Sequence, residues 1–149
     1  MIRGKNITLR TIKPEEIDLL YKLIFSIHEK GPYWHLHIQS VSDFKKEYER
    51  TGFWSDEEGR MIIENNEGLI VGEILYFKGL DYQADYEVGY ELFSKEYSGN
   101  GYMSEALLLF CAYMFSVRPI RRIQVNVMED NIASRKVVEK CGFTYEGTM

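Results

Sequence analysis

Short segments in which apolar and polar residues alternate run along this chain, and such alternation predicts β-strands with one buried face. These segments cover residues 5–12, 60–65, 69–78, 84–93 and 122–128. Within 84–93 the alternation assigns Tyr86, Val88, Tyr90 and Leu92 to one face and Asp85, Glu87, Gly89 and Glu91 to the other. The triplet Asn66-Glu67-Gly68 predicts a hairpin turn between the second and third strands, and another turn is expected around 79–82.

Other segments carry apolar residues at helical spacing. One helix is predicted from Pro14, a residue that suits the first helical position, and its apolar face consists of Ile17, Leu20, Ile24 and Ile27. Ser42 is expected to cap a short second helix. Two further helices are predicted over residues 101–116 and 130–140.

The order of these elements predicts the fold. The strand–helix–strand order over 84–128 favours two parallel, adjacent strands, because a crossover helix joins them. The earlier strands are joined by short turns and should pair antiparallel. We therefore expect an α+β domain with a mixed, mostly antiparallel sheet flanked by about four helices, and the whole chain, 1–149, forms a single domain.

Composition and charge exclude several classes of protein. Hydrophobic residues make up 45% and charged residues 28% of the chain, which is typical of soluble globular proteins. The formal net charge of −5 argues against a surface that coats nucleic acid. The N-terminus lacks the apolar stretch of a signal peptide, and no apolar run is long enough to span a bilayer. We therefore expect a cytoplasmic protein without a nucleic-acid or membrane partner.

The residues that bind metals offer no convincing site. Cys111 and Cys141 lie in apolar helical patterns and are expected to be reduced, buried thiols. Neither a CxxC nor an HExxH spacing occurs, and the pair His35 and His37 has no evident third ligand. We predict that the protein uses no metal.

The stretch EYSGNGYMSEAL, residues 96–107, places Gly99 and Gly101 between a strand and a helix. The start of a helix exposes unpaired N–H groups and partial positive charge, so a glycine turn there suits a phosphate group. The alternative is a tight turn without a ligand. The stretch lacks the Gly-Lys-Ser/Thr of a Walker loop, and Ser104 stands where a dinucleotide fingerprint has its third glycine.

Two separated motifs carry a resemblance to a known family. The run YELFSKEYSGNGYMSEAL, the strand RRIQVNVMEDN and the helix NIASRKVVEKCGF together resemble the GNAT superfamily of N-acetyltransferases. The likeness is greatest to the branch with the ribosomal-protein and spermidine/spermine N-acetyltransferases. It implies a GNAT-like fold in which the two parallel strands, 84–93 and 122–128, splay apart. The family continues with a further hairpin strand beyond Gly147, so one or more C-terminal strands are expected to be missing here.

The resemblance implies acetyl-CoA as co-substrate. Its pyrophosphate would lie on the backbone amides of Ser98, Gly99, Asn100, Gly101, Tyr102, Met103 and Ser104. Its pantetheine arm would pair with the strand end formed by Leu92, Phe93 and Ser94, and Asn131 would lie beside the coenzyme.

Acetyl transfer to an amine needs a base, donors for the oxyanion and an acid for the thiolate. Glu87 is the first candidate for the base and Glu73 the second; alternatively, Glu87 is a solvated strand carboxylate, or with Asp85 and Glu91 it holds a cationic substrate. A backbone N–H near Leu92 is the expected oxyanion donor. Many family members have a tyrosine that acts as the general acid where this chain has Val138, so Ser134 is the candidate acid here. The alternative role of Asn131 and Ser134 is helix capping.

The predicted function is transfer of an acetyl group to a small-molecule or peptide primary amine, such as a polyamine, a protein N-terminus, an amino sugar or an amino acid. Tyr33, Trp34 and His35 fall in the loop that lines the acceptor site in similar proteins, where aromatic rings either hold an ammonium or pack the loop. The alternatives are a catalytically silent acyl-CoA sensor and a nucleotide-binding domain. Because a missing strand exposes a sheet edge, a partner strand or a homodimer is also considered.

Overall fold

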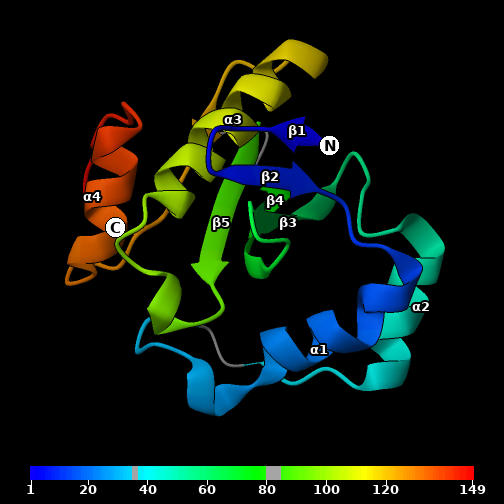
Figure 1. Cartoon of the computed structure of the whole chain (residues 1–149). Coiled ribbons are helices and arrows are strands. Elements are labelled where there is room, and N and C mark those ends of the chain that lie inside the picture. The colour runs from blue at the N-terminus through cyan, green and yellow to red at the C-terminus, as the bar shows by residue number, and fades with distance from the viewer. Residues whose placement is uncertain (35–36, 80–84) are drawn as a thin grey trace.

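The computed structural model describes residues 1–34, 37–79 and 85–149, and within them six strands form one sheet with helices on both faces (Figure 1). The strands follow each other across the sheet in chain order: β1 (Ile2–Arg3), β2 (Ile7–Arg10), β3 (Glu58–Asn65), β4 (Ile70–Lys78), β5 (Tyr86–Leu92) and β6 (Ile123–Gln124). Neighbouring strands pair antiparallel except β5 and β6, which are parallel. The predicted α+β class with a mixed, mostly antiparallel sheet is confirmed.

The helices are placed by two hydrophobic clusters, one on each face of the sheet. In the described residues the helices are α1 (Ile17–Phe25), α2 (Val41–Thr51), α3 (Tyr102–Val117) and α4 (Ile132–Lys140), with three 3₁₀ turns, η1 (Pro14–Glu16), η2 (Ile27–Glu29) and η3 (Lys95–Tyr97). On one face α3 buries Leu107 and Phe110 against Ile74 and Val88 of the sheet. On the other face α1 and α2 bury residues that include Leu20, Phe44, Ile62 and Phe93.

Several predicted boundaries were wrong. The first predicted strand, 5–12, is shorter than expected, because only Ile7–Arg10 forms β2. The chain turns just before it, where the Gly4 N–H donates to Ile7 O at 2.8 Å, and β1 pairs antiparallel with β2. The helix cap is Ser40 and not Ser42, since the Ser40 hydroxyl accepts from the Asp43 N–H at 3.0 Å. Ile27 does not belong to the buried helix face: α1 ends at Phe25, and Ile27 is 54% exposed.

The strand predicted at 122–128 is shorter than expected, and this determines the shape of the molecule. Only Tyr86 and Glu87 of β5 pair with β6, opposite Ile123 and Gln124. Beyond Gln124 the chain leaves the sheet toward α4. The C-terminal part of β5, after Glu87, therefore has β4 as its only strand partner among the described residues. The predicted splaying of the two parallel strands is therefore confirmed.

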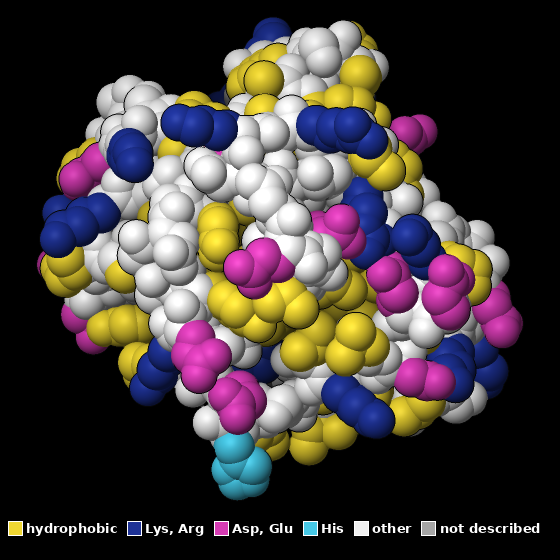
Figure 2. All heavy atoms as spheres, viewed as in Figure 1, with side chains coloured by type: hydrophobic (Ala, Val, Ile, Leu, Met, Phe, Trp, Pro, Cys, Tyr) yellow, Lys and Arg dark blue, Asp and Glu magenta, His cyan; other side chains and the backbone are white. Residues whose placement is uncertain are grey.

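The surface shows no large basic area on the face drawn in Figure 2. Lys and Arg side chains are scattered over this face, while hydrophobic side chains gather near its centre with acidic side chains beside them. Within the described part of the chain, no helix has both the length and the apolar character needed to cross a membrane.

Candidate active site

The glycine turn forms an uncapped helix start. Gly99 and Gly101 have φ of +78° and +76°, in the left-handed region that disfavours residues with a side chain. Gly101 is the N-cap of α3 and provides no side-chain acceptor for the first amides of the helix. A Cβ added at either glycine would meet no atom within 4 Å, so the space in front of these amides is open.

The residues around these glycines hold the turn in place from behind. The Asn100 side-chain amide donates to Tyr97 O at 3.1 Å, and the first intrahelical bond runs from Glu105 N to Gly101 O at 3.1 Å. Met103 and Ser104 are buried, so the first turn of α3 is packed onto the sheet. The N–H groups of this turn thus have a fixed direction and no intrahelical partner, which is the arrangement that binds anions.

The free edge of β5 presents backbone amides to the same region. Phe93 N–H donates to Val71 O of the β4 side at 2.9 Å. Because successive amides of a strand point to opposite sides, the N–H of Leu92 points to the side where β6 has ended. This is the place that the sequence predicted for the oxyanion donor and for the pantetheine arm.

The start of α4 lies across this gap from β5. Asn131 caps the helix by accepting from the Ser134 N–H at 3.1 Å, so the capping role considered for these two residues is real. The hydroxyl groups of Ser134 and Tyr90 lie 2.7 Å apart. Burial raises the pKa of Tyr90, while the bond to Ser134 lowers it. Val138, in the position where a tyrosine was considered, packs against the main core cluster.

Glu87 lies at the point where β5 and β6 separate. Its carboxylate accepts from Gln124 Nε2 at 3.2 Å and from Asn126 Nδ2 at 2.9 Å. Its side chain shares a face of the sheet with Gly89, above which a Cβ would again meet no atom within 4 Å. Glu87 is therefore oriented by two neutral amides beside an open surface.

The second candidate base, Glu73, is not accessible in the same way. It is 1% exposed, lies opposite Glu91 across β4 and β5, and accepts from Arg60 at 3.0 Å. Glu91 is 9% exposed, and both its oxygens accept from Lys30 Nζ, at 3.0 and 2.8 Å. Burial and the adjacent Glu73 raise the pKa of Glu91 to about 9, against the opposing effect of Lys30.

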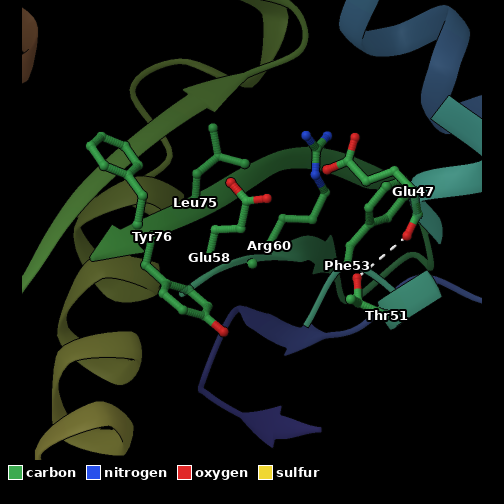
Figure 3. A pocket seen from close by; sticks show the side chains of 9 residues that line it. Glu47, Thr51, Phe53, Glu58, Arg60, Leu75 and Tyr76 are labelled. Carbon is green, nitrogen blue, oxygen red and sulfur yellow. Dashed lines mark hydrogen bonds between the residues drawn. The ribbon is translucent and has the colours of Figure 1, made fainter. Parts of the chain in front are cut away.

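A cavity of about 150 Å³ lies on the same face of the sheet, between α2 and the strands β3 and β4 (Figure 3). Arg60 points into it from β3 toward Glu47 of α2, and its guanidinium also bonds Glu73. The cavity is lined by Glu47, Thr51, Phe53, Glu58, Gly59, Arg60, Leu75, Tyr76 and Phe77. None of these residues belongs to the glycine turn or to the free edge of β5, so this cavity is separate from the predicted coenzyme site.

The predicted acceptor loop contacts the site from both sides. The Tyr33 hydroxyl donates to Asp130 O, next to the cap of α4, at 2.9 Å. Lys30 Nζ lies 4.0 Å from the centroid of the Trp34 ring. Trp34 thus contacts a cation of the chain itself. His35 lies outside the described residues.

Sequence reasoning missed three residues of this region: Lys30, Arg60 and the hydroxyl of Tyr90. The alternation of β5 assigned Tyr90 to the core face, and it does pack there, but its hydroxyl extends to α4. Lys30 and Arg60 were not recognised, because no local sequence pattern shows which lysine or arginine will lie next to a buried acid. The presence of Glu73 in an otherwise apolar strand was the available sign that a buried cation was needed.

Cys111 and Cys141 are free and partly buried, and burial raises the pKa of Cys111 to about 12. The described residues contain no group of three or more His, Cys, Asp or Glu side chains that is able to hold a metal ion.

Comparison with known proteins identifies the class to which this fold belongs. The family model of the acetyltransferase (GNAT) domain matches residues 6–144. The chain therefore belongs to the GNAT family of acetyltransferases, as the two sequence motifs predicted. A relative from Bacillus subtilis (strain 168), the uncharacterized N-acetyltransferase YnaD, is 26% identical over 129 residues, which cover 76% of this chain and 75% of that protein.

Solved structures share the fold at lower identity. The aminoglycoside acetyltransferase AAC(6')-Ib, in complex with paromomycin and acetyl-CoA, superposes with a TM-score of 0.79 at 18% identity, covering 97% of this chain and 86% of that one. Spermidine N-acetyltransferase from Vibrio cholerae, in complex with CoA and spermine, gives a TM-score of 0.73 at 19% identity, covering 97% and 84%. At these identities the likeness shows the fold.

Proposed function

We propose that this acetyltransferase moves the acetyl group of acetyl-CoA directly to a primary amine. The observation that carries the proposal is the uncapped start of α3 behind two left-handed glycines, beside a strand edge that has lost its partner. A diphosphate needs N–H donors and positive potential, and both are available there. A thioester arm needs an open strand edge, which β5 offers.

The residues proposed to hold the coenzyme come from three elements. The amides of residues 98–104 would hold the pyrophosphate, those of 92–94 the pantetheine arm, and Asn131 the far side of the cleft. The open space in front of Gly99 and Gly101 leaves room for this contact. Acetyl-CoA, when bound, supplies an activated acetyl thioester. No metal enters the proposal.

Glu87 is the proposed general base. The amine must lose a proton before its lone pair attacks, and Glu87 faces the open surface above Gly89. Gln124 and Asn126 orient its carboxylate without neutralising it. Glu73 is the weaker candidate because its bond to Arg60 and its burial keep it from an incoming amine.

Leu92 and Ser134 are proposed to stabilise the other charges. The Leu92 N–H, on the open side of β5, would donate to the carbonyl oxygen as negative charge develops on it. The Ser134 hydroxyl would donate to the departing thiolate sulfur, and Tyr90 at 2.7 Å would replace the proton that Ser134 gives up.

The acceptor is proposed to be a cationic primary amine. Spermine and paromomycin, named for two proteins of the same fold, are both polyamines in the chemical sense. The net charge of −5 favours encounter with such cations. The free Cys111 and Cys141 agree with a reaction in the reducing cytoplasm.

The test is a turnover assay with acetyl-CoA and a panel of amines: spermidine, spermine, kanamycin, a peptide with a free N-terminus and single amino acids. CoA should be separated by chromatography, because thiol reagents also react with the protein's own cysteines, and the acetylated amine identified by mass spectrometry. We expect steady CoA release with at least one amine, above the rate without amine. Tight CoA binding without turnover would instead support a silent sensor, and stabilisation by ATP or NAD but not CoA would contradict the proposal.

A further inference from the structure

The loop of residues 30–34 is attached to both walls of the proposed coenzyme cleft. On the β5 wall, Lys30 Nζ donates to both carboxylate oxygens of Glu91. On the α4 wall, the Tyr33 hydroxyl donates to Asp130 O, one residue before the helix cap. Figure 1 shows this loop, after η2, at the end of the sheet where β5 ends. The loop thus bridges the two elements that β6 no longer joins.

The two attachments differ in strength. The Lys30 side chain is 5% exposed, and its ammonium lies between Glu91 and the rings of Trp34, at 4.0 Å, and Phe93, at 5.4 Å. Breaking this contact would leave the Lys30 ammonium buried without a partner, so this end is fixed. Tyr33 is 37% exposed and holds Asp130 by one hydrogen bond between neutral groups, so this end releases easily.

The position of the fixed end relates the loop to the reacting atoms. Glu91 immediately precedes Leu92, the proposed oxyanion donor, and Phe93 contacts Lys30 within the segment proposed to pair with the pantetheine arm. Asp130 immediately precedes Asn131, the proposed contact on the far side. A loop tied to these two points crosses the cleft at the level of the thioester, on the face of the sheet from which the amine approaches.

We propose that loop 30–34 is a strap across the acceptor-side mouth of the coenzyme cleft, and that Tyr33 is the positioning residue that holds it to the α4 wall. The strap rests on the proposed function, since it requires the thioester to lie between β5 and α4. It pivots on Lys30 and detaches at Asp130 when the coenzyme leaves. When Tyr33 bonds Asp130 again, the strap, including Trp34, returns to a fixed distance from the thioester.

The experiment measures the dissociation rate of CoA by stopped-flow displacement with excess acetyl-CoA. Tyr33→Phe removes only the hydroxyl, and one such bond corresponds to about a fivefold faster dissociation. Tyr145→Phe is the matched control, because the Tyr145 hydroxyl bonds Thr148 near the C-terminus and not the strap. Trp34 lies in the strap and serves as a fluorescent reporter, while Trp54 packs on Tyr76 on the other face.

Substitutions of Lys30 test the other attachment of the strap independently. Lys30→Gln should speed CoA dissociation in the same direction, and Lys30→Arg, which keeps a cation near Glu91, should restore much of the parent rate. If the contact between Lys30 and Glu91 only supported the fold, Lys30→Gln would lower the melting temperature without changing the dissociation rate of CoA from the folded protein. A parent-like dissociation rate in Tyr33→Phe or in folded Lys30→Gln would overturn the strap. A parent protein that binds no CoA would overturn the proposed function and the strap with it.

Discussion

The proposed function depends most on the two glycines of the turn at 98–104. Their positive φ explains why they are glycines, and the open space before them leaves room for the proposed diphosphate. Gly101→Val should abolish measurable CoA binding, because a side chain would cover the first amides of α3. The strain of a branched residue at φ of +76° should also lower the free energy of unfolding, by about 1–2 kcal/mol.

The control for this variant is Gly68→Val in the β3–β4 hairpin. Gly68 has φ of +80° and equally open surroundings, so it suffers the same backbone strain far from the turn. Isothermal titration with CoA should find parent affinity in Gly68→Val and none in Gly101→Val. Equal affinity in both variants would remove the pyrophosphate from this turn.

Glu87→Gln tests the base. The substitution keeps the size and the neighbouring amides but removes the proton acceptor, and loss of general base catalysis should lower kcat/KM by about 10²–10⁴. The pH–rate profile should lose its acidic limb. Glu129→Gln, an exposed carboxylate between β6 and α4, serves as control. A profile for Glu87→Gln that superposes on the parent's would assign the proton transfer to another group.

At the scale of elements, the sequence predicts the helix α2, but only the structure shows which serine caps it. Ser40 and Ser42 both precede a helical pattern, but only the Ser40 hydroxyl accepts from the Asp43 N–H. Ser40→Ala should therefore cost about 1 kcal/mol of unfolding free energy, and Ser42→Ala, at an exposed helical position, close to nothing. Urea denaturation of both variants measures the difference; the reverse order would restore the cap predicted from the sequence.

The strands and the turn were readable because their patterns are local. Alternation located β3, β4 and β5, and the glycine turn with the start of α3 followed from residues adjacent in sequence. The length of β6 was not readable: 122–128 alternates throughout, yet only Ile123 and Gln124 pair, because the partner strand diverges. The Lys30–Glu91 and Tyr90–Ser134 contacts join residues far apart in the chain, and no local pattern specifies them.

At the scale of the whole molecule, the buried carboxyl of Glu91 should make the stability of the fold depend on pH. Glu91 has a pKa raised from 4.5 to about 9 in the folded state, so the folded protein binds a proton that the unfolded chain has lost. The stabilisation that this bound proton provides is complete below about pH 4.5, and it disappears as the pH rises through about 9. Glu16 acts in the opposite direction: the hydrogen bond from Arg10 lowers its pKa, so its contribution is lost as the pH falls.

Glu91→Gln should flatten this dependence. We expect the unfolding free energy of the parent to fall between pH 5 and pH 9 more steeply than that of Glu91→Gln, in denaturant titrations at each pH. Glu67→Gln, in the exposed β3–β4 turn, should follow the parent. A parent whose stability is constant across this range would show that Glu91 stays ionised beside Lys30.

The homodimer considered from the exposed sheet edge stays a prediction, which sedimentation at several protein concentrations would check. The proposed site needs no second copy of the chain, since the glycine turn, the β5 edge and the start of α4 all come from one chain.

The most direct test of the account is a crystal structure of the protein grown with CoA. We predict that the diphosphate lies on the backbone amides of residues 98–104 and that the pantetheine arm follows β5 past Leu92 toward Ser134. A diphosphate bound anywhere else, or a structure in which CoA at saturating concentration leaves the start of α3 without a ligand, would contradict it.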